Sequence, residues 1–186
     1  MSMGSAGVFV VLLWITATVT AGPDPDHRAH GPHVHGSGEI NLAVEGADLY
    51  LELSSPAANL VGFEHAPHNV QQQAQLQQLR ALLSEPARLF VLPEEAACQP
   101  LAAKVEMPWS GDPGQPAEHA DPGHAATHAD VFAEYRFVCE RPTALVGLEV
   151  LLFDLFPGLQ QLQVQYIAPG AQAAAMLTPR QRSLRF

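Results

Sequence analysis

The histidines are the residues of this sequence best suited to chemistry, and they are concentrated in three short segments. The 186-residue chain has nine histidines against three tyrosines and four methionines. Neutral imidazole is the most common nitrogen ligand of zinc, and neighbouring carboxylates can complete its shell. The three groups are His27, His30, His33 and His35; His65 and His68; and His119, His124 and His128. This clustering predicts metal binding.

The first two groups are expected to meet at one end of a β-hairpin. Four histidines within nine residues favour a metal-binding segment over an inert polar tail. In an antiparallel hairpin the start of the first strand lies beside the end of the second, so His35 can approach Glu64 and His65. The alternative for His65 and His68 is that they are ordinary polar groups at a helix start. The sequence therefore predicts a site of His35, His65 and a carboxylate.

The third group lies in segment 108–130, which has no apolar periodicity. The segment contains four prolines, three glycines, four carboxylates and neither lysine nor arginine, and such a composition cannot build a core. We expect a surface loop whose histidines form a flexible chelating arm, with an inert hydrophilic insert as the alternative. Without a methionine cluster or free thiolates Cu(I) is disfavoured. Zn(II) is expected first, with Ni(II) and Cu(II) as competitors.

Catalysis is not expected from these residues. Ser54 and Ser55 stand beside Pro56 without a Gly-x-Ser-x-Gly elbow, and the chain has no His-Glu-x-x-His sequence. A zinc hydrolase needs three fixed ligands, an open position and a general base, whereas these histidines are expected mostly on flexible segments. We therefore predict metal binding without chemistry, in a protein that is not an enzyme.

The charge balance argues against nucleic acids and anionic membranes as partners. Nineteen acidic residues against nine basic ones give a formal net charge of −10, and Lys104 is the only lysine. Such a chain repels phosphate groups, and cationic partners fit it better.

The N-terminus has the pattern of a secretory signal. Residues 8–19 form an apolar run that ends at Val19, Thr20 and Ala21, a small-residue cleavage pattern. We expect a signal peptide over residues 1–21. A retained anchor is the alternative, although the run is shorter than the roughly 20 residues that span a bilayer. In the oxidising compartment that follows, Cys98 and Cys139 are expected to form one disulfide.

The rest of the sequence predicts an α+β fold with a mostly antiparallel β-sheet and one main helix. Alternating apolar residues predict a hairpin from 39–45 and 49–53, and Asn69 is expected to cap a helix of about fifteen residues. Further strands are expected at 88–92, 99–107, 133–137, 145–153, 162–166, 173–177 and 184–186, with 133–137 and 145–153 forming a second hairpin. One compact domain over 39–186 would follow a flexible, histidine-rich segment over 22–38. The alternative is two packed ββαββ-type halves, 39–107 and 131–186, related by an internal repeat.

Several segments resemble a known family. His33, Val34, His35 and Gly36 precede INLAVEG at 40–46 and LYLELSSPAANLVGFEHAP at 49–67. AEYRFVCERP follows at 133–142, and LFDLFPGLQQLQVQYIAPG at 152–170. Together they resemble the ZrgA-like family of bacterial periplasmic zinc-uptake proteins over nearly the whole chain after residue 21.

The resemblance implies a soluble periplasmic accessory of high-affinity zinc import, acting with an ABC-type zinc transporter and its solute-binding protein. The family's ligand positions carry over onto His33 and His35, onto Glu64 and His65, and onto His119, His124 and His128. The loop departs from the long His-Asp or His-Glu repeats of relatives, because alanine, glycine and proline dilute its histidines. This dilution predicts that the loop binds fewer zinc ions, or binds them more weakly, than the loops of such relatives.

Three functions remain open at this point. The first is capture of Zn(II) for import, and the second is zinc storage or buffering without a transport partner. The third is a metal-independent interaction module whose sheet edges, or whose apolar turn at 153–159, dock a partner protein. The sequence does not predict an oligomeric state.

Overall fold

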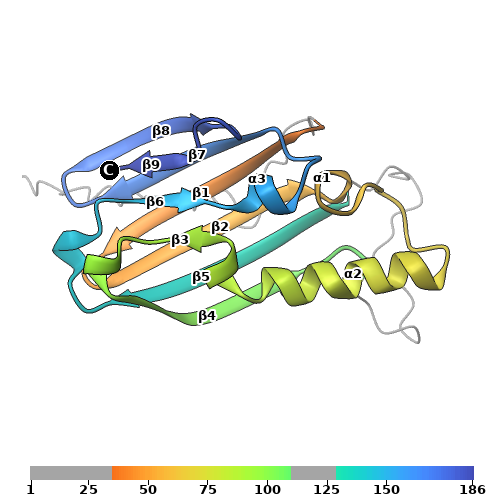
Figure 1. Cartoon of the computed structure of the whole chain (residues 1–186), viewed down its shortest axis with the longest axis horizontal. Helices are drawn as coiled ribbons and strands as arrows, with labels where there is room; N and C mark the ends of the chain where they lie inside the picture. The colour runs from red at the N-terminus through yellow and green to blue at the C-terminus, as the bar shows by residue number, and fades with distance from the viewer. Residues whose placement is uncertain (1–34, 110–128) are drawn as a thin grey trace, which may run out of the picture. The chain divides into compact units, whose positions relative to one another are not determined.

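The computed structural model describes residues 35–109 and 129–186, which form two β-sheets and three α-helices (Figure 1). The large sheet has six strands in the order β4-β5-β2-β1-β7-β8, and the small sheet has three in the order β3-β6-β9. The predicted signal peptide, His33 and the loop histidines lie outside the described residues.

The large sheet consists of β1 Ser37–Glu45, β2 Asp48–Pro56, β4 Cys98–Glu106, β5 Asp130–Cys139, β7 Gln161–Ala168 and β8 Ala171–Leu177. The small sheet consists of β3 Phe90–Val91, β6 Gly147–Val150 and β9 Ser183–Arg185. The helices are α1 Ala57–Val61, α2 Val70–Leu83 and α3 Leu152–Leu155. The α+β class, with a mostly antiparallel sheet and one main helix, is confirmed.

The hairpin of β1 and β2 follows from the alternation of apolar residues. Ile40 lies opposite Leu53, and Leu42 lies opposite Leu51. All four side chains are buried, because side chains two residues apart on a strand share one face. β1 also pairs in parallel with β7 on its other edge, a contact that the sequence did not predict. This strand is therefore held on both sides.

The small sheet and α2 lie over one face of the large sheet (Figure 1). Leu79 and Leu83 of α2 and Phe90 of β3 belong to the same buried cluster as Leu51 of β2. α2 begins where the sequence predicts, because the side chain of Asn69 accepts a hydrogen bond from the N–H of Gln72 at 2.9 Å. In the described part of the chain, no helix is long and apolar enough to cross a membrane.

The predicted second hairpin is wrong. β5 lies in the large sheet between β4 and β2, whereas β6 lies in the small sheet between β3 and β9. A short 3-10 helix, Pro142–Ala144, separates the two strands and turns the chain between the sheets. The apolar run 145–153 contains β6 and the beginning of α3, because such a run fits a buried helical turn as well as a strand. The two halves of the chain therefore use their first two strands differently.

The apolar turn at 153–159 does not form a docking surface. Phe153, Phe156 and Leu159 are buried in the core. The expected strand at 88–92 is also reduced, to the two residues of β3. An interaction module of the kind considered above would have to use a sheet edge.

The disulfide between Cys98 and Cys139 is confirmed. The two residues lie opposite each other in the register of β4 and β5, and they are 41 positions apart in sequence. The bridge closes a long loop, so it reduces the conformational freedom of the unfolded chain.

Replacing Cys98→Ser and Cys139→Ser together is expected to lower the free energy of unfolding by about 4 kcal/mol, from the loss of loop-closure entropy. Urea unfolding followed by circular dichroism measures the change. Reductant should reproduce the loss in the native chain and leave the double variant unchanged. A loss below about 1 kcal/mol would show that the bridge does not act through the unfolded state.

Candidate metal site

An imidazole and a carboxylate meet at the end of the large sheet where β1 begins. His35 stands just before β1, and Glu64 follows α1, which continues directly from β2. The Nε2 atom of His35 lies 3.4 Å from each carboxylate oxygen of Glu64. The two side chains are 74% and 37% exposed. The hairpin and α1 together therefore bring His35 to Glu64, an approach that the sequence predicted.

A second pair of histidines lies a few residues further along the chain. The rings of His65 and His68 have their centroids 4.3 Å apart, and Phe63 stacks on His65 at 5.1 Å. Nδ1 of His65 lies 2.9 Å from the carbonyl oxygen of Ala66. A carbonyl can only accept a hydrogen bond, so Nδ1 donates this one, and in the neutral ring Nε2 then keeps its lone pair. That nitrogen is in the form that binds a metal ion.

The start of helix α2 fixes the backbone beside this pair. The N–H of His68 donates to Oε1 of Gln72 at 2.8 Å. Gln72 in turn donates its own N–H to Asn69, the residue that caps the helix. This reciprocal arrangement is that of a capping box shifted by one residue, and it orients the chain at His68.

A buried amide holds His35 near the segment that carries Glu64. Asn59 of α1 is 4% exposed. Its Oδ1 accepts from the N–H of Gly36 at 2.7 Å, and its Nδ2 donates to the carbonyl of Ser37 at 2.8 Å and to Oγ of Ser55 at 3.2 Å. One side chain therefore joins α1 to the starting residues of β1 and to the end of β2. This role of Asn59 was not predicted from the sequence. The feature that could have indicated it is a single amide side chain within an otherwise apolar segment.

The segment before β7 completes this corner. Gly36 has φ +83°, a conformation that favours glycine, and its carbonyl accepts from the N–H groups of Gln160 and Gln161 at 2.7 and 2.9 Å. Gly158 packs against α1 so closely that a Cβ atom there would lie 2.7 Å from the carbonyl oxygen of Asn59. Gly36 is therefore favoured by its backbone conformation, and Gly158 is required by the close approach of α1.

The described residues on either side of 110–128, the range that contains the loop histidines, contact residues of α1 and the segment after it. Trp109, on the N-terminal side, stacks on Phe63 with ring centroids 6.3 Å apart. Ala129, on the C-terminal side, is buried and accepts a hydrogen bond from the N–H of Ala57 at 2.7 Å. The two described ends of this segment therefore contact Phe63, beside Glu64 in the chain, and Ala57, the first residue of α1.

The predicted ligands form two pairs in the described residues. His35 and Glu64 lie together, and His65 and His68 lie together, but across 35–109 and 129–186 no three histidine, cysteine or acidic side chains form one metal-binding group. The remaining predicted ligands, His33, His119, His124 and His128, lie outside these ranges.

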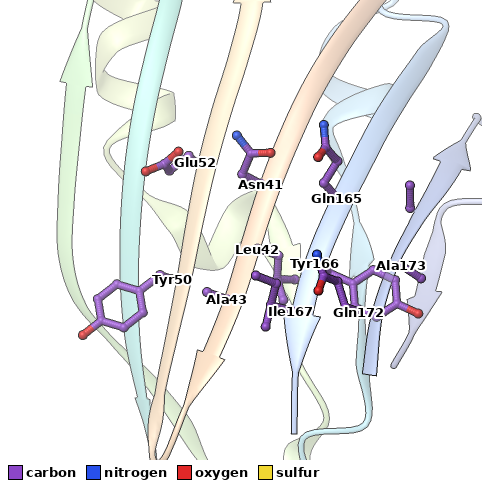
Figure 2. A pocket seen from close by; sticks show the side chains of 11 residues that line it. Asn41, Leu42, Ala43, Tyr50, Glu52, Gln165, Tyr166, Ile167, Gln172 and Ala173 are labelled. Carbon is purple, nitrogen blue, oxygen red and sulfur yellow. The ribbon is translucent and has the colours of Figure 1, made fainter. Parts of the chain in front are cut away.

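A groove of a different character lies on the exposed face of the large sheet (Figure 2). Its volume is about 640 Å³. It is lined mainly by amides and apolar groups, without histidine, and its wall includes Asn41, Tyr50, Glu52, Gln165, Ile167 and Gln172. Beside it, Arg136 lies over the ring of Tyr50 at 5.6 Å. A hydrogen bond to Asp48, together with the charge of that carboxylate, raises the pKa of Arg136.

The imidazole of His35 and the carboxylate of Glu64 at the sheet end are groups of the kind that can bind a metal ion. A family model described as "ZrgA family zinc uptake protein" matches residues 32–186. No curated protein matches the chain. The match covers the candidate site and both sheets, and the chain belongs to the ZrgA family of zinc uptake proteins.

Replacing Asn59→Ala is expected to lower the free energy of unfolding by about 1–3 kcal/mol, because it leaves the N–H of Gly36 and the carbonyl of Ser37 without their buried partner. Asn41→Ala is the matched control, because Asn41 is an exposed amide on β1, the strand whose start Asn59 contacts. This variant should change the free energy of unfolding by less than about 0.5 kcal/mol. Urea unfolding of both variants provides the measurement. Equal losses would contradict the role given to the buried amide.

Proposed function

We propose that this protein captures Zn(II) in the periplasm and assists its high-affinity import by an ABC-type zinc transporter. The observation that carries the proposal is the position of His35 over the Glu64 carboxylate, beside the pair His65 and His68. Membership of a zinc uptake family supports zinc as the ion. The ion is the cargo of the protein rather than a resident cofactor.

The spacing of His35 and Glu64 suits a shared zinc ion. Zinc binds imidazole nitrogen at about 2.0–2.1 Å and carboxylate oxygen at about 2.0–2.2 Å, so tetrahedral geometry separates two such ligands by about 3.4 Å. The observed separation is 3.4 Å. That distance exceeds a normal hydrogen bond, and an ion pair this exposed contributes at most about 1 kcal/mol to stability. The pair is better suited to binding an ion than to stabilising the fold.

Further ligands come from nearby histidines. Nε2 of His65 is available as a ligand, and the ring of His68 lies against the ring of His65. His33 is two residues before His35, within about 7 Å of chain length. We propose that zinc is bound by His33, His35, Glu64 and His65, with His68 as an additional ligand.

The loop histidines are proposed to gather zinc for this site. His119, His124 and His128 belong to a segment with no lysine or arginine to repel a cation. The described residues on either side of that segment, Trp109 and Ala129, contact Phe63 and Ala57. An ion bound in the segment is therefore tethered near Glu64, at a high effective concentration.

Storage and import predict different growth phenotypes. A cell lacking an import protein should grow poorly only when zinc is scarce. A cell lacking a storage protein should instead grow poorly under zinc excess. We propose that the protein carries out no reaction on its cargo. Export through the signal peptide over residues 1–21 and delivery to a transporter component are parts of the same proposal.

Zinc titration of chelator-stripped protein against a competing chelator tests the ligand assignment. Glu64→Gln keeps the shape of the side chain but removes its charge. It should lower the affinity of the tightest zinc site by at least about tenfold. Glu39→Gln is the matched control, since Glu39 is exposed on β1, and it should bind zinc like the native chain. Equal affinities of the two variants would remove Glu64 from the site.

A variant with His119, His124 and His128 all changed to alanine should bind fewer zinc ions in native mass spectrometry while keeping the tightest one. His27→Ala, outside the matched residues 32–186, serves as its control. Loss of the tightest zinc from the triple variant would move the main site to the loop. Absence of zinc binding in the native chain would contradict the proposed function.

Zinc affinity is expected to fall as the pH drops below about 6.5, where protons compete with the metal for histidine nitrogen. Because zinc binds only the neutral imidazole, each bound histidine must release its proton, and the loss steepens with the number of histidine ligands. Titrations at several pH values measure the slope. A constant affinity between about pH 7.5 and about pH 5.5 would contradict ligation by histidine.

A further inference from the structure

The two edges of the large sheet differ in how they are protected. β4, at one edge, contains Pro100, and its register with β5 shifts between Pro100 and Ala102. It also carries the ion pair of Lys104 and Glu106. Proline, irregular register and charge are the features that prevent a second chain from pairing with an edge strand. β4 is therefore a closed edge.

β8, at the other edge, has none of these features. Its sequence is AQAAAML, without proline or charge, and it pairs with β7 over seven residues without a shift. Within 35–109 and 129–186 it is the last strand of its sheet. A regular, uncharged edge strand presents backbone N–H and C=O groups to any strand that can reach it.

The neighbouring strand extends this uncharged surface. Residues 161–177, which form β7, its turn and β8, include no charged residue, although 15% of the whole chain is charged. Ile167 and Met176 are 57% and 47% exposed on this hairpin. Large exposed apolar side chains beside an open edge are typical of an interaction surface.

We propose that β8 pairs antiparallel with β8 of a second copy of this chain. The lack of charge on the hairpin 161–177 is what permits a second copy as the occupant. With a net charge of −10, two copies repel each other through most surfaces, but the hairpin 161–177 lets them meet without placing carboxylates opposite one another. The contact is self-complementary, as a two-fold dimer requires.

The sequence of β8 fits a two-fold axis at Ala174. In this register Ala174 lies opposite Ala174 of the second copy, and Gln172 lies opposite its Met176. Because Gln172 already pairs with Ile167, its side chain would lie between Ile167 of its own copy and Met176 of the other. The second strand would also extend the groove, whose wall includes Gln172, Ala173 and Ala174 (Figure 2).

Sedimentation velocity of the purified, zinc-free chain over a range of concentrations tests the proposal. The native chain should form a dimer. Ala174→Lys places two like charges at the two-fold axis and should weaken the dimer by at least about tenfold. Ala102→Lys, the same substitution at an exposed position of β4, should leave the dimer unchanged.

Ala174→Cys gives a positive test of the register. Directly opposed residues of antiparallel strands have Cα atoms about 4.5–5.5 Å apart, within the range of a disulfide. Oxidation should link two copies of Ala174→Cys and leave Ala102→Cys monomeric on a non-reducing gel. Unchanged zinc affinity in Ala174→Lys would show that the edge is separate from the metal site. A native chain that stays monomeric, or a dimer that Ala174→Lys does not weaken, would overturn the proposal.

Discussion

The hydrogen bonds of the Asn59 side-chain amide are the interactions on which the candidate metal site depends. The amide satisfies backbone groups of Gly36 and Ser37 and the hydroxyl of Ser55 from a buried position. An unpaired amide in the same place would be costly, so the start of β1 is confined to the position where those groups are satisfied. His35 is one residue from this anchor. Its distance from Glu64 is therefore set by the packing of α1 against the sheet.

This arrangement combines a rigid support with exposed ligands. The contacts of Asn59, Gly36 and Gly158 fix the backbone at this corner, while the side chains of His35 and Glu64 remain open to solvent. Ligands held on a supported backbone bind with less loss of conformational freedom. Their exposure would also let another protein reach an ion bound there. The proposed site is therefore suited to exchanging zinc rather than to burying it permanently.

The sequence predicted the elements with strong local signals. The β1–β2 hairpin follows from alternation, and α2 follows from the cap at Asn69. The approach of His35 to Glu64 was predicted from the hairpin, whereas the contribution of α1 and Asn59 to it was not. In contrast, the parallel pairing of β1 with β7 joins segments more than a hundred residues apart, and no local pattern reports it. The failed hairpin of 133–153 has a related cause, since an apolar run does not indicate which of two sheets buries it.

The geometry of the candidate site could be predicted only in part, for the same reason. Histidine spacing indicates the chemistry, but the role of Asn59 depends on three segments that meet only in the folded chain. The lack of charge at 161–177 can be read from the sequence. Its role in the proposed pairing, however, depends on β8 being the last strand of the large sheet in the described part of the chain. Residue types thus predict the ligands, and the fold determines which of them share a site or an edge.

Diffraction from zinc-loaded crystals at the zinc absorption edge tests the central claim most directly, because it locates the ion without any assumption about its ligands. The account predicts an anomalous peak between Nε2 of His35 and the carboxylate of Glu64, at about 2.0–2.2 Å from each ligand atom. Zinc found only at other residues, with none within coordination distance of His35 and Glu64, would contradict it.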